Sequence, residues 1–334
     1  MTPSHPAEAP LLDVRGLSVA FPSPRGDLMA VDRVSLSVGR GETVALVGES
    51  GSGKSMSALA IMRLTPPGAR MSADWLGLDG ADMSKLGERE IRDIRGRRIA
   101  MVFQNPMSSL NAVLTIGRQI TESLERHMGL HGRIARARAI ELLAMVDVPA
   151  PGKLVDAYPH QLSGGMRQRA MIAMALAAGP ELLIADEPTT ALDVTIQAQI
   201  MELLGRLQRE MGMAVLLITH DLGVVAGVAN RVYVMYGGRM FEYGQVDDVF
   251  RDPAQPYTIG LLDTVRQLSD ESTESLIPIP GQPPGPGPVL VGCAFAPRCR
   301  FVVDLCREET PPLRAMGRDR AAACHVAEPR AETA

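Results

Sequence analysis

The chain has 334 residues, of which 46% are hydrophobic and 22% charged, as in ordinary folded proteins with a sizeable core. Its net charge of −4 weighs against nucleic-acid-binding proteins, which more often carry a basic surplus. Residues 1–10 hold neither a basic nor an apolar stretch, so we predict no signal peptide. The most apolar stretch, 171–185, is interrupted by Gly179-Pro180, so we predict no membrane span and a cytoplasmic chain, unless a partner holds it at a membrane.

The N-terminal part of the chain predicts three strands and a helix. Partial alternation predicts strands over 11–21 and 30–38. The run 43–47 is continuously apolar and rich in β-branched residues, which is typical of a buried parallel strand. A Gly-rich segment follows at once, and a helix rich in Ala, Met and Leu is predicted to begin after Lys54.

The Gly-rich segment has the sequence of a phosphate-binding loop. Its eight residues are Gly48, Glu49, Ser50, Gly51, Ser52, Gly53, Lys54 and Ser55. Glycines let backbone N–H groups surround phosphate oxygens, and the following helix presents its positive N-terminal end. In such a loop Lys54 contacts the β- and γ-phosphates and Ser55 ligates Mg²⁺. A chance Gly/Ser turn is the alternative, but the strand before it and the helix after it favour a nucleotide site.

Two carboxylates follow another apolar run. The run 182–185 predicts a buried strand, and Asp186 and Glu187 come directly after it. Because ligands bind at the carboxyl ends of strands in open α/β sheets, we predict that Asp186 holds Mg²⁺. Glu187 is then placed to act as general base toward the attacking water. A solvated strand end is the alternative interpretation.

Two further polar residues stand at predicted strand ends. His220 follows the strand 215–219, where a neutral imidazole can bind the γ-phosphate and orient water, although a lone His is more often structural. Gln104 ends the apolar stretch 99–103, where an amide can contact Mg²⁺ or the water. Taken alone, Gln104 is a weak signal.

A second anion-binding helix end is predicted within the mostly helical region that begins at 107. Ser163 is a natural N-cap, and Gly164 and Gly165 leave backbone N–H groups free for an anion. Since one nucleotide needs one such cradle, this one is interpreted as serving the ATP of a neighbouring subunit. An ordinary capped helix is the alternative.

The remaining predictions concern the C-terminal half. We predict a helix over 195–211, a hairpin of 232–235 and 239–242 around Gly237-Gly238, and a helix over 257–268. The Pro/Gly-rich run 278–288 predicts an extended linker before a short tail.

That tail carries all four cysteines of the chain: Cys293, Cys299, Cys306 and Cys324. Four thiolates can hold zinc or an iron–sulfur cluster, and His325 is an alternative ligand. The spacing lacks the paired C-x₂-C segments of most structural zinc sites, and free or disulfide-bonded thiols also stay open.

Taken in order, the phosphate loop, Gln104, the LSGGM segment, the strand before Asp186-Glu187, and His220 resemble the ATP-binding cassette (ABC) superfamily. The resemblance implies an α/β P-loop NTPase fold of the ABC-cassette type, with a RecA-like core sheet, an antiparallel β subdomain, an α-helical signature subdomain and a C-terminal Cys-bearing tail. It also implies a head-to-tail dimer holding two ATP molecules. Phe21 falls where an aromatic residue stacks on adenine, and 190–193 matches the D-loop. A core Phe that closes the first strand is the alternative.

Longer segments resemble the ATP-binding subunits of oligopeptide/dipeptide permeases. These are QNPMSSLNAVLTIGRQI, YPHQLSGGMRQRAMIAMALAAGPELLIADEPTTALDVTIQAQIM and ITHDLGVVA. The resemblance as a whole extends over roughly residues 11–325. Met166 stands where most cassettes have Gln, although this branch commonly has Met at that position. Ala112 stands where the branch usually has Pro. For the tail, the resemblance implies a [4Fe–4S] cluster on the four cysteines, with zinc as the alternative.

The resemblance also implies the assembly and the function. The partners would be a second ABC ATPase subunit in a heterodimer, two membrane permeases and an extracytoplasmic solute-binding protein, with no nucleic acid, at the cytoplasmic face of the membrane. We therefore expect an ATPase domain over 11–268 with its helical subdomain at about 107–180, a linker over 269–288 and a Cys tail over 289–325. The expected function is ATP-driven uptake of di- or oligopeptides or a related small solute. The alternative is a soluble ABC ATPase that is not tied to transport.

Overall fold

The computed structural model describes residues 9–24, 26–190, 192–269, 279–285, 287 and 291–329. It divides into two compact units, which we call the split unit (Met1–Ser84 with Ile218–Ala334) and the inserted unit (Lys85–Leu217). Within the predicted linker of 269–288, residues 270–278, 286 and 288 lie outside the described residues, as does Ala191 of the predicted D-loop. Among the described residues, no helix combines the length and the apolar character needed to cross a bilayer.

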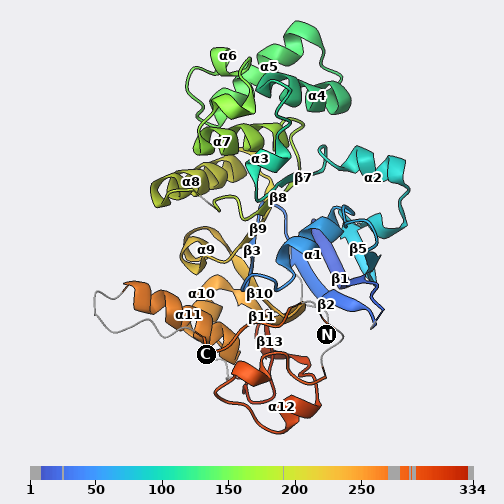
Figure 1. Cartoon of the computed structure of the whole chain (residues 1–334), viewed down its shortest axis with the longest axis vertical. Helices are drawn as coiled ribbons and strands as arrows, with labels where there is room; N and C mark the ends of the chain where they lie inside the picture. The colour runs from blue at the N-terminus through green and yellow to red at the C-terminus, as the bar shows by residue number, and fades with distance from the viewer. Residues whose placement is uncertain are drawn as a thin grey trace. The chain divides into compact units, whose positions relative to one another are not determined.

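An antiparallel sheet forms the N-terminal part of the split unit (Figure 1). Its strands are β1 (Leu12–Phe21), β2 (Leu28–Val38), β4 (Arg70–Ser72), β5 (Trp75–Leu78) and β6 (Ala81–Asp82). The order is β2-β1-β5-β6, with β4 also on β1. The sequence predicted β1 and β2 within two residues of their ends, and the short strands β4 to β6 were not predicted.

The second set of strands in the split unit mixes parallel and antiparallel pairs in the order β12-β13-β11-β10-β3. The strands are β3 (Thr43–Val47), β10 (Arg231–Tyr236), β11 (Arg239–Gln245), β12 (Leu313–Gly317) and β13 (Arg320–Ala323). β3 and β10 are parallel, whereas β10 and β11 form the predicted antiparallel hairpin. All six residues of β10 are buried, as expected for a strand covered on both faces. The tail therefore continues this sheet, because β13 pairs with β11.

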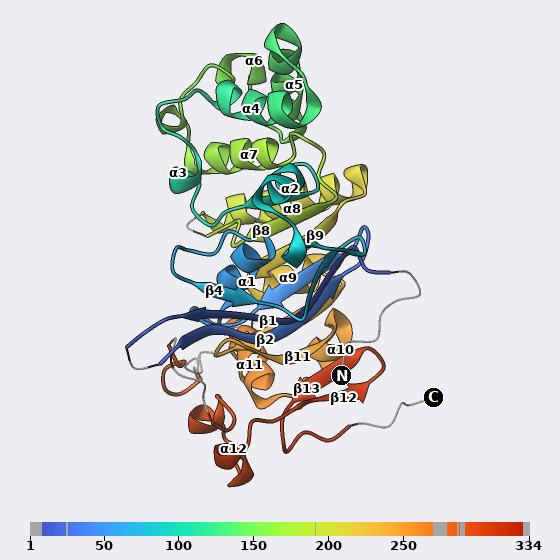
Figure 2. The same ribbon diagram turned by 90° about the vertical axis from the view of Figure 1, so that its right-hand side faces the viewer.

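The helices of the split unit include two that the sequence predicted. They are α1 (Lys54–Ile61), η1 (Met83–Lys85) at the division, α9 (Leu222–Val228), α10 (Val246–Arg251), α11 (Pro256–Ser269), η3 (Ala296–Arg298) and α12 (Leu305–Glu308). α1 and α11 match the predicted helices. In both views α12 and the β12–β13 hairpin lie together at one end of this unit (Figures 1 and 2).

An aromatic cluster joins the tail to the rest of the split unit. Tyr236 on β10 has its ring centroid 4.6 Å from that of Tyr257 on α11 and 5.3 Å from that of Phe295 in the tail. Phe241 on β11 completes the cluster at 5.2 Å from Tyr236. Since such ring pairs stabilise a fold beyond the apolar area they bury, this cluster fixes the tail against β10, the strand that pairs with β3.

The inserted unit contains strands in the order β9-β8-β7 and a group of helices. Its elements are α2 (Glu88–Ile94), β7 (Ile99–Val102), α3 (Pro106–Ser109), α4 (Ile116–Met128), α5 (Gly132–Met145), α6 (Pro151–Leu154), η2 (Pro159–Gln161), α7 (Gly164–Ala175), β8 (Leu182–Asp186) and α8 (Val194–Met211), and β9 (Ala214–Thr219) spans the division. β7 and β8 are parallel. The helices α4 to α7 gather together in both views, which confirms the helical pattern predicted for this region (Figures 1 and 2).

Candidate functional site

The Gly-rich segment forms a loop between β3 and α1, and its conformation requires glycine at two positions. Gly48 has φ 150°, and a Cβ there would lie 2.2 Å from the carbonyl oxygen of Met235. Gly53 has φ 100°, and a Cβ there would lie 2.6 Å from the carbonyl oxygen of Ala30. Because neither backbone oxygen can move without displacing a strand, only glycine fits. The loop thus runs close along the neighbouring backbone before it enters the helix.

Lys54 places its ammonium group inside this loop. Its Nζ donates to the carbonyl oxygens of Gly48 at 2.7 Å and of Glu49 at 3.0 Å, and the residue is buried. Ser55 follows it in the first turn of α1 and is half-buried. A buried cation at the positive end of a helix favours an anion, which suits the predicted contact with phosphates.

Two side chains that the sequence analysis missed hold Glu49 in the loop. The backbone N–H of Glu49 donates to the hydroxyl of Tyr257 at 2.8 Å. Its carboxylate accepts from Arg298 in the tail, at 2.6 and 3.0 Å. Nothing in the sequence pattern connects these residues, because they lie more than two hundred positions from the loop.

The end of β8 carries the predicted catalytic carboxylate in the inserted unit. Asp186 is the buried last residue of the strand. Glu187 follows with φ 44°, a left-handed conformation that is unusual for a residue other than glycine. Its Oε2 accepts hydrogen bonds from Nε2 of Gln104 at 2.8 Å and from Oγ1 of Thr190 at 2.7 Å. The structure therefore brings Gln104 and Glu187 into contact, which the sequence analysis did not anticipate, and it adds Thr190.

The two remaining residues of the predicted nucleotide set belong to the split unit. His220 follows β9 and is exposed, and the next residue, Asp221, caps α9 by accepting from the N–H of Val224 at 3.1 Å. Phe21 is the half-buried last residue of β1. Both positions match the predicted strand ends, and their roles toward a nucleotide stay predictions.

The second cradle lies at the start of α7. The Oγ of Ser163 accepts from the N–H of Met166 at 3.3 Å, which confirms the predicted N-cap. Ser163 and Gly164 are exposed. A Cβ on Gly165 would lie 3.0 Å from the side chain of Ile196, so this glycine also lets α7 lie close to α8. The helix end is open to an incoming anion, as the prediction requires.

The four cysteines of the tail carry free thiols, with Cys306 and Cys324 buried and the other two half-buried. The pKa of the Cys293 thiol is raised to about 11, mainly by burial and to a smaller extent by the three neighbouring thiols. Cys299 also has a raised pKa, and its Sγ accepts from the N–H of Phe301 at 3.4 Å. The thiols are thus near one another, but no group of three or more His, Cys, Asp or Glu among the described residues is arranged to hold a metal ion.

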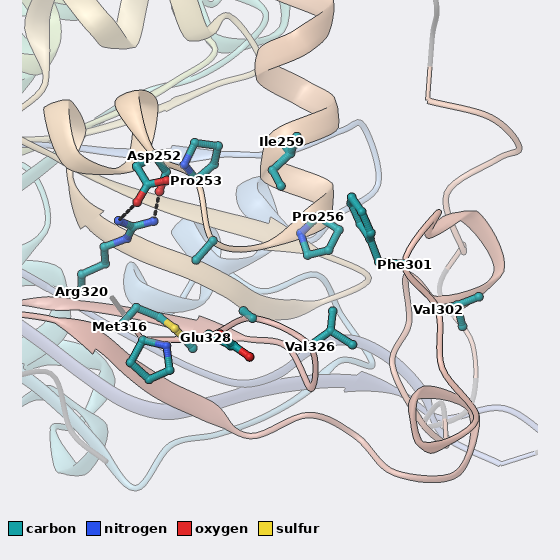
Figure 3. A pocket seen from close by; sticks show the side chains of 13 residues that line it. Asp252, Pro253, Pro256, Ile259, Phe301, Val302, Met316, Arg320, Val326 and Glu328 are labelled. Atoms are coloured by element: carbon teal, nitrogen blue, oxygen red, sulfur yellow. Dashed lines mark hydrogen bonds and ion pairs between the residues drawn. The ribbon is translucent and has the colours of Figure 1, made fainter. Parts of the chain in front are cut away.

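A separate hollow of about 640 Å³ lies in the split unit, between residues 252–259 and the tail (Figure 3). Its walls are mostly apolar and include Pro256, Ile259 and Met316. Arg320 crosses it toward Asp252, and the same guanidinium reaches Glu242 at 3.0 Å. These contacts make Arg320 part of the structural frame of the tail.

Comparison with known proteins agrees with the geometry. Residues 31–190 match the ABC transporter family, and residues 241–306 match the family described as the oligopeptide/dipeptide transporter C-terminal region. A Brucella melitensis relative that bears the name of a peptide import ATP-binding protein is 50% identical over 326 residues, covering 94% of this chain and 96% of its own length. The oligopeptide transport ATP-binding protein OppD of Bacillus subtilis is 49% identical over 305 residues, covering 91% and 85%.

Solved structures give the same result for the fold. A dimeric post-hydrolysis state of the ATP-binding cassette MJ0796, bound to ADP and phosphate, is 30% identical with a TM-score of 0.63, and the match covers 70% of this chain and 98% of that one. CbiO1 from Clostridium perfringens, part of an ABC transporter complex, is 28% identical with a TM-score of 0.62, covering 73% and 92%. The expected ABC-cassette fold is thereby confirmed. The chain belongs to the ABC transporter family and is an ATP-hydrolysing subunit of its oligopeptide/dipeptide branch.

Proposed function

We propose that this ATPase subunit drives the uptake of di- or oligopeptides across the cytoplasmic membrane, at whose cytoplasmic face it works. The support comes from the relatives named for peptide import and from the match of residues 241–306 to the transporter C-terminal region. A related small solute is compatible with the same motor, since the ATPase does not itself contact the solute. The rival function, a soluble ABC ATPase unconnected with transport, is not favoured by these relatives.

The observation that carries the ATPase part is the held carboxylate of Glu187. Gln104 and Thr190 both donate to its Oε2, which orients the other oxygen and keeps the side chain at the strand end beside Asp186. A carboxylate so oriented can accept a proton from water as the water oxygen attacks the γ-phosphorus and the bond to ADP breaks.

The nucleotide would be held by the residues of the phosphate loop. Lys54 and the backbone N–H groups of Gly48–Ser55 would bind phosphate oxygens, with Phe21 against the adenine and His220 at the γ-phosphate. Ser55, Asp186 and Gln104 supply the hydroxyl, carboxylate and amide oxygens that suit Mg²⁺. When bound, Mg²⁺ neutralises charge that develops on the β- and γ-phosphates.

The site would be completed by a second ATPase subunit. The helix end at Ser163, Gly164 and Gly165, of which the first two residues are exposed, can bind the γ-phosphate of ATP held on the partner's loop. We propose a heterodimer with a related chain, because the two ATPase subunits of this branch are often different. Residues 190–193 would cross the interface, although Ala191 lies outside the described residues.

The membrane partners would be two permeases, which connect the motor to an extracytoplasmic solute-binding protein. The inserted unit offers exposed apolar side chains after Gln104, where Met107 is 53% exposed and Val113 is 78% exposed. Large apolar side chains exposed within one short segment suit a protein contact, and a permease helix is the proposed occupant.

For the tail we propose a [4Fe–4S] cluster on Cys293, Cys299, Cys306 and Cys324, with zinc as the alternative. The support is that the thiols lie near one another and that Cys299 accepts an N–H hydrogen bond. Against it stands the absence of a ready-made metal-binding group among the described residues. Anaerobically purified protein should be brown and contain acid-labile sulfide, whereas a colourless protein with stoichiometric zinc would favour the alternative.

The hydrolytic role is tested by Glu187→Gln. We expect ATP binding to persist while the hydrolysis rate falls by about 10²- to 10⁴-fold, the usual contribution of a general base. Glu202→Gln on α8 is a matched control, because Glu202 is exposed on the same unit. Hydrolysis at the wild-type rate in Glu187→Gln would exclude Glu187 as the base.

The transport role is tested by isolating the intact chain from membranes. We expect permease chains to co-purify and a radiolabelled dipeptide or oligopeptide to enter vesicles only when ATP is hydrolysed. Purification without membrane proteins, together with ATPase activity that nucleic acid stimulates, would instead support the soluble alternative.

A further inference from the structure

An ion pair connects the Cys-bearing tail directly to the phosphate loop. Nη1 and Nη2 of Arg298 donate to Oε2 and Oε1 of Glu49 at 2.6 and 3.0 Å. The side chain of Arg298 is 5% exposed and that of Glu49 is 26% exposed. Such a two-point contact between a guanidinium and a carboxylate fixes orientation as well as distance.

Arg298 is held rigidly before it reaches Glu49. Its Nε donates to the carbonyl oxygen of Pro280 at 2.8 Å, Nη2 donates to that of Ile279 at 3.2 Å, and Nη1 donates to the hydroxyl of Tyr236 at 3.2 Å. With the two bonds to Glu49, these contacts match the five N–H donors of a guanidinium. The Arg298 side chain therefore has one favourable position, and Glu49 can form the ion pair only at that position.

The cysteine segment determines where Arg298 lies. The residue ends the turn η3, in which the N–H of Ala296 donates to the carbonyl oxygen of Cys293 at 2.9 Å and that of Cys299 donates to Ala296 at 3.4 Å. The N–H of Cys293 in turn donates to the carbonyl oxygen of Cys306 at 2.7 Å. Any change in the fold around these cysteines would therefore move the guanidinium.

Glu49 needs such a partner because of what its loop binds. A carboxylate beside Gly48 and Lys54 would repel the phosphates of a nucleotide if its charge were left unpaired. Arg298 supplies the opposite charge from the tail, while Tyr257 holds the backbone N–H of the same residue at 2.8 Å. The loop is thus held from both its backbone and its side chain.

We propose that Arg298 is a positioning residue for ATP binding, acting by holding and neutralising Glu49. The affinity for ATP then depends on the folded state of the cysteine segment, which makes the tail a regulatory part of the ATP site. This inference rests on the proposed role of Gly48–Ser55 as the phosphate-binding loop.

The test is a double-mutant cycle on the intact chain, read out as the Kd of a fluorescent ATP analogue with Mg²⁺. In the wild-type background, Arg298→Gln should weaken binding about tenfold, a typical size for coupling between two sites. In the Glu49→Gln background, the same substitution should change Kd less than twofold, because no carboxylate charge is then left unpaired by the loss of Arg298. Equal losses in both backgrounds would mean that Arg298 only folds the tail, and no loss in either would also overturn the proposal.

Three further variants make the result decisive. Arg300→Gln is the matched control in the same segment, since the Arg300 side chain is 67% exposed and lies 3.9 Å from Asp263; its Kd should be unchanged. If Arg298→Gln does not fold, Arg298→Lys replaces it in both backgrounds, because lysine keeps the charge but cannot make the two-point guanidinium contact. In the wild-type background the affinity for ATP should then fall about threefold. Lys54→Ala tests the loop itself, and retained ATP binding in that variant would contradict the proposed function. If Lys54→Ala loses ATP binding while Arg298→Gln binds ATP as the wild type does, only this inference is contradicted.

Discussion

Single residues of the phosphate loop differ sharply in what they tolerate. Gly48 and Gly51 both have positive φ values, 150° and 80°. A Cβ on Gly48 would meet the Met235 carbonyl oxygen at 2.2 Å, whereas a Cβ on Gly51 would have nothing within 4 Å. Replacing each glycine in turn therefore separates the destabilisation due to a strained backbone conformation from that due to a steric clash.

We expect Gly48→Ala to lower the free energy of unfolding by about 3 kcal/mol, since both conformational strain and overpacking apply. Gly51→Ala should cost about 1 kcal/mol, the strain of a left-handed residue alone. Urea unfolding of the two variants, analysed with a common m-value, gives the comparison. Similar losses would show that the loop can move away from β10.

The sequence singles out the candidate nucleotide-site residues but misses the side chains that hold the loop in place. Lys54, Asp186, Glu187 and His220 stand at strand or helix ends, so hydrophobic runs reveal them. Arg298 contacts the loop only through the folded chain, and neither its neighbours nor its spacing gives a signal. Local patterns therefore indicate where a ligand binds, while long-range contacts decide what holds the binding residues.

Among the elements, the last turn of α4 carries a histidine whose surroundings disfavour its charge. Partial burial lowers the pKa of His127 below its usual 6.5, and the charges of Arg126 and Arg97 lower it further, against an opposing effect of Asp93. The ring also packs against the turn at Gly96, where a Cβ would lie 2.9 Å from Nε2.

The pKa shift of His127 gives a pH dependence with a definite sign. Below about pH 6.5 the unfolded chain binds the proton more readily than the folded one, so acid lowers the free energy of unfolding. We expect His127→Gln to lose less stability than the wild type between pH 6.5 and 5, measured by urea unfolding. His131→Gln, at an exposed position, is the control and should follow the wild type. An unchanged pH slope in His127→Gln would contradict this assignment.

Elements with strong patterns were predicted well, and those without them were missed. β3, β8 and β9 are continuous apolar runs, and their bounds were predicted to within a residue. β13 reads Arg-Ala-Ala-Ala, which is poor in the β-branched residues that favour strands. It forms because β11 offers an edge to pair with and not because of its own residues.

At the scale of the whole chain, one buried carboxylate joins the tail to the central strands. Glu242 on β11 is fully buried and accepts from the N–H groups of Ala254 and Gln255 at 2.9 and 3.1 Å. Its third partner is Arg320 on β13 at 3.0 Å. Because a buried charge without its counter-ion is costly, this pair makes the tail part of the core.

We expect Arg320→Leu to lower the free energy of unfolding by about 3–5 kcal/mol, the usual cost of removing one partner of a buried ion pair. Adding Glu242→Gln should recover part of the loss, because the unpaired charge is then removed. Arg318→Leu, in the exposed turn between β12 and β13, should cost less than 0.5 kcal/mol, about the effect of an ordinary surface change. Thermal or urea unfolding measures all three, and a small loss in Arg320→Leu would show that water reaches Glu242.

The division of the chain also sets an order of assembly during synthesis. Val44 on β3 pairs with Arg231 on β10, and the whole inserted unit is made between them. At about 5–20 residues per second, β3 leaves the ribosome about ten to forty seconds before its partner exists. A strand that is apolar after its first residue and has open edges invites pairing with other chains during that time. The nascent polypeptide therefore has its greatest need of a chaperone while the inserted unit is being translated, before the ATP site can form.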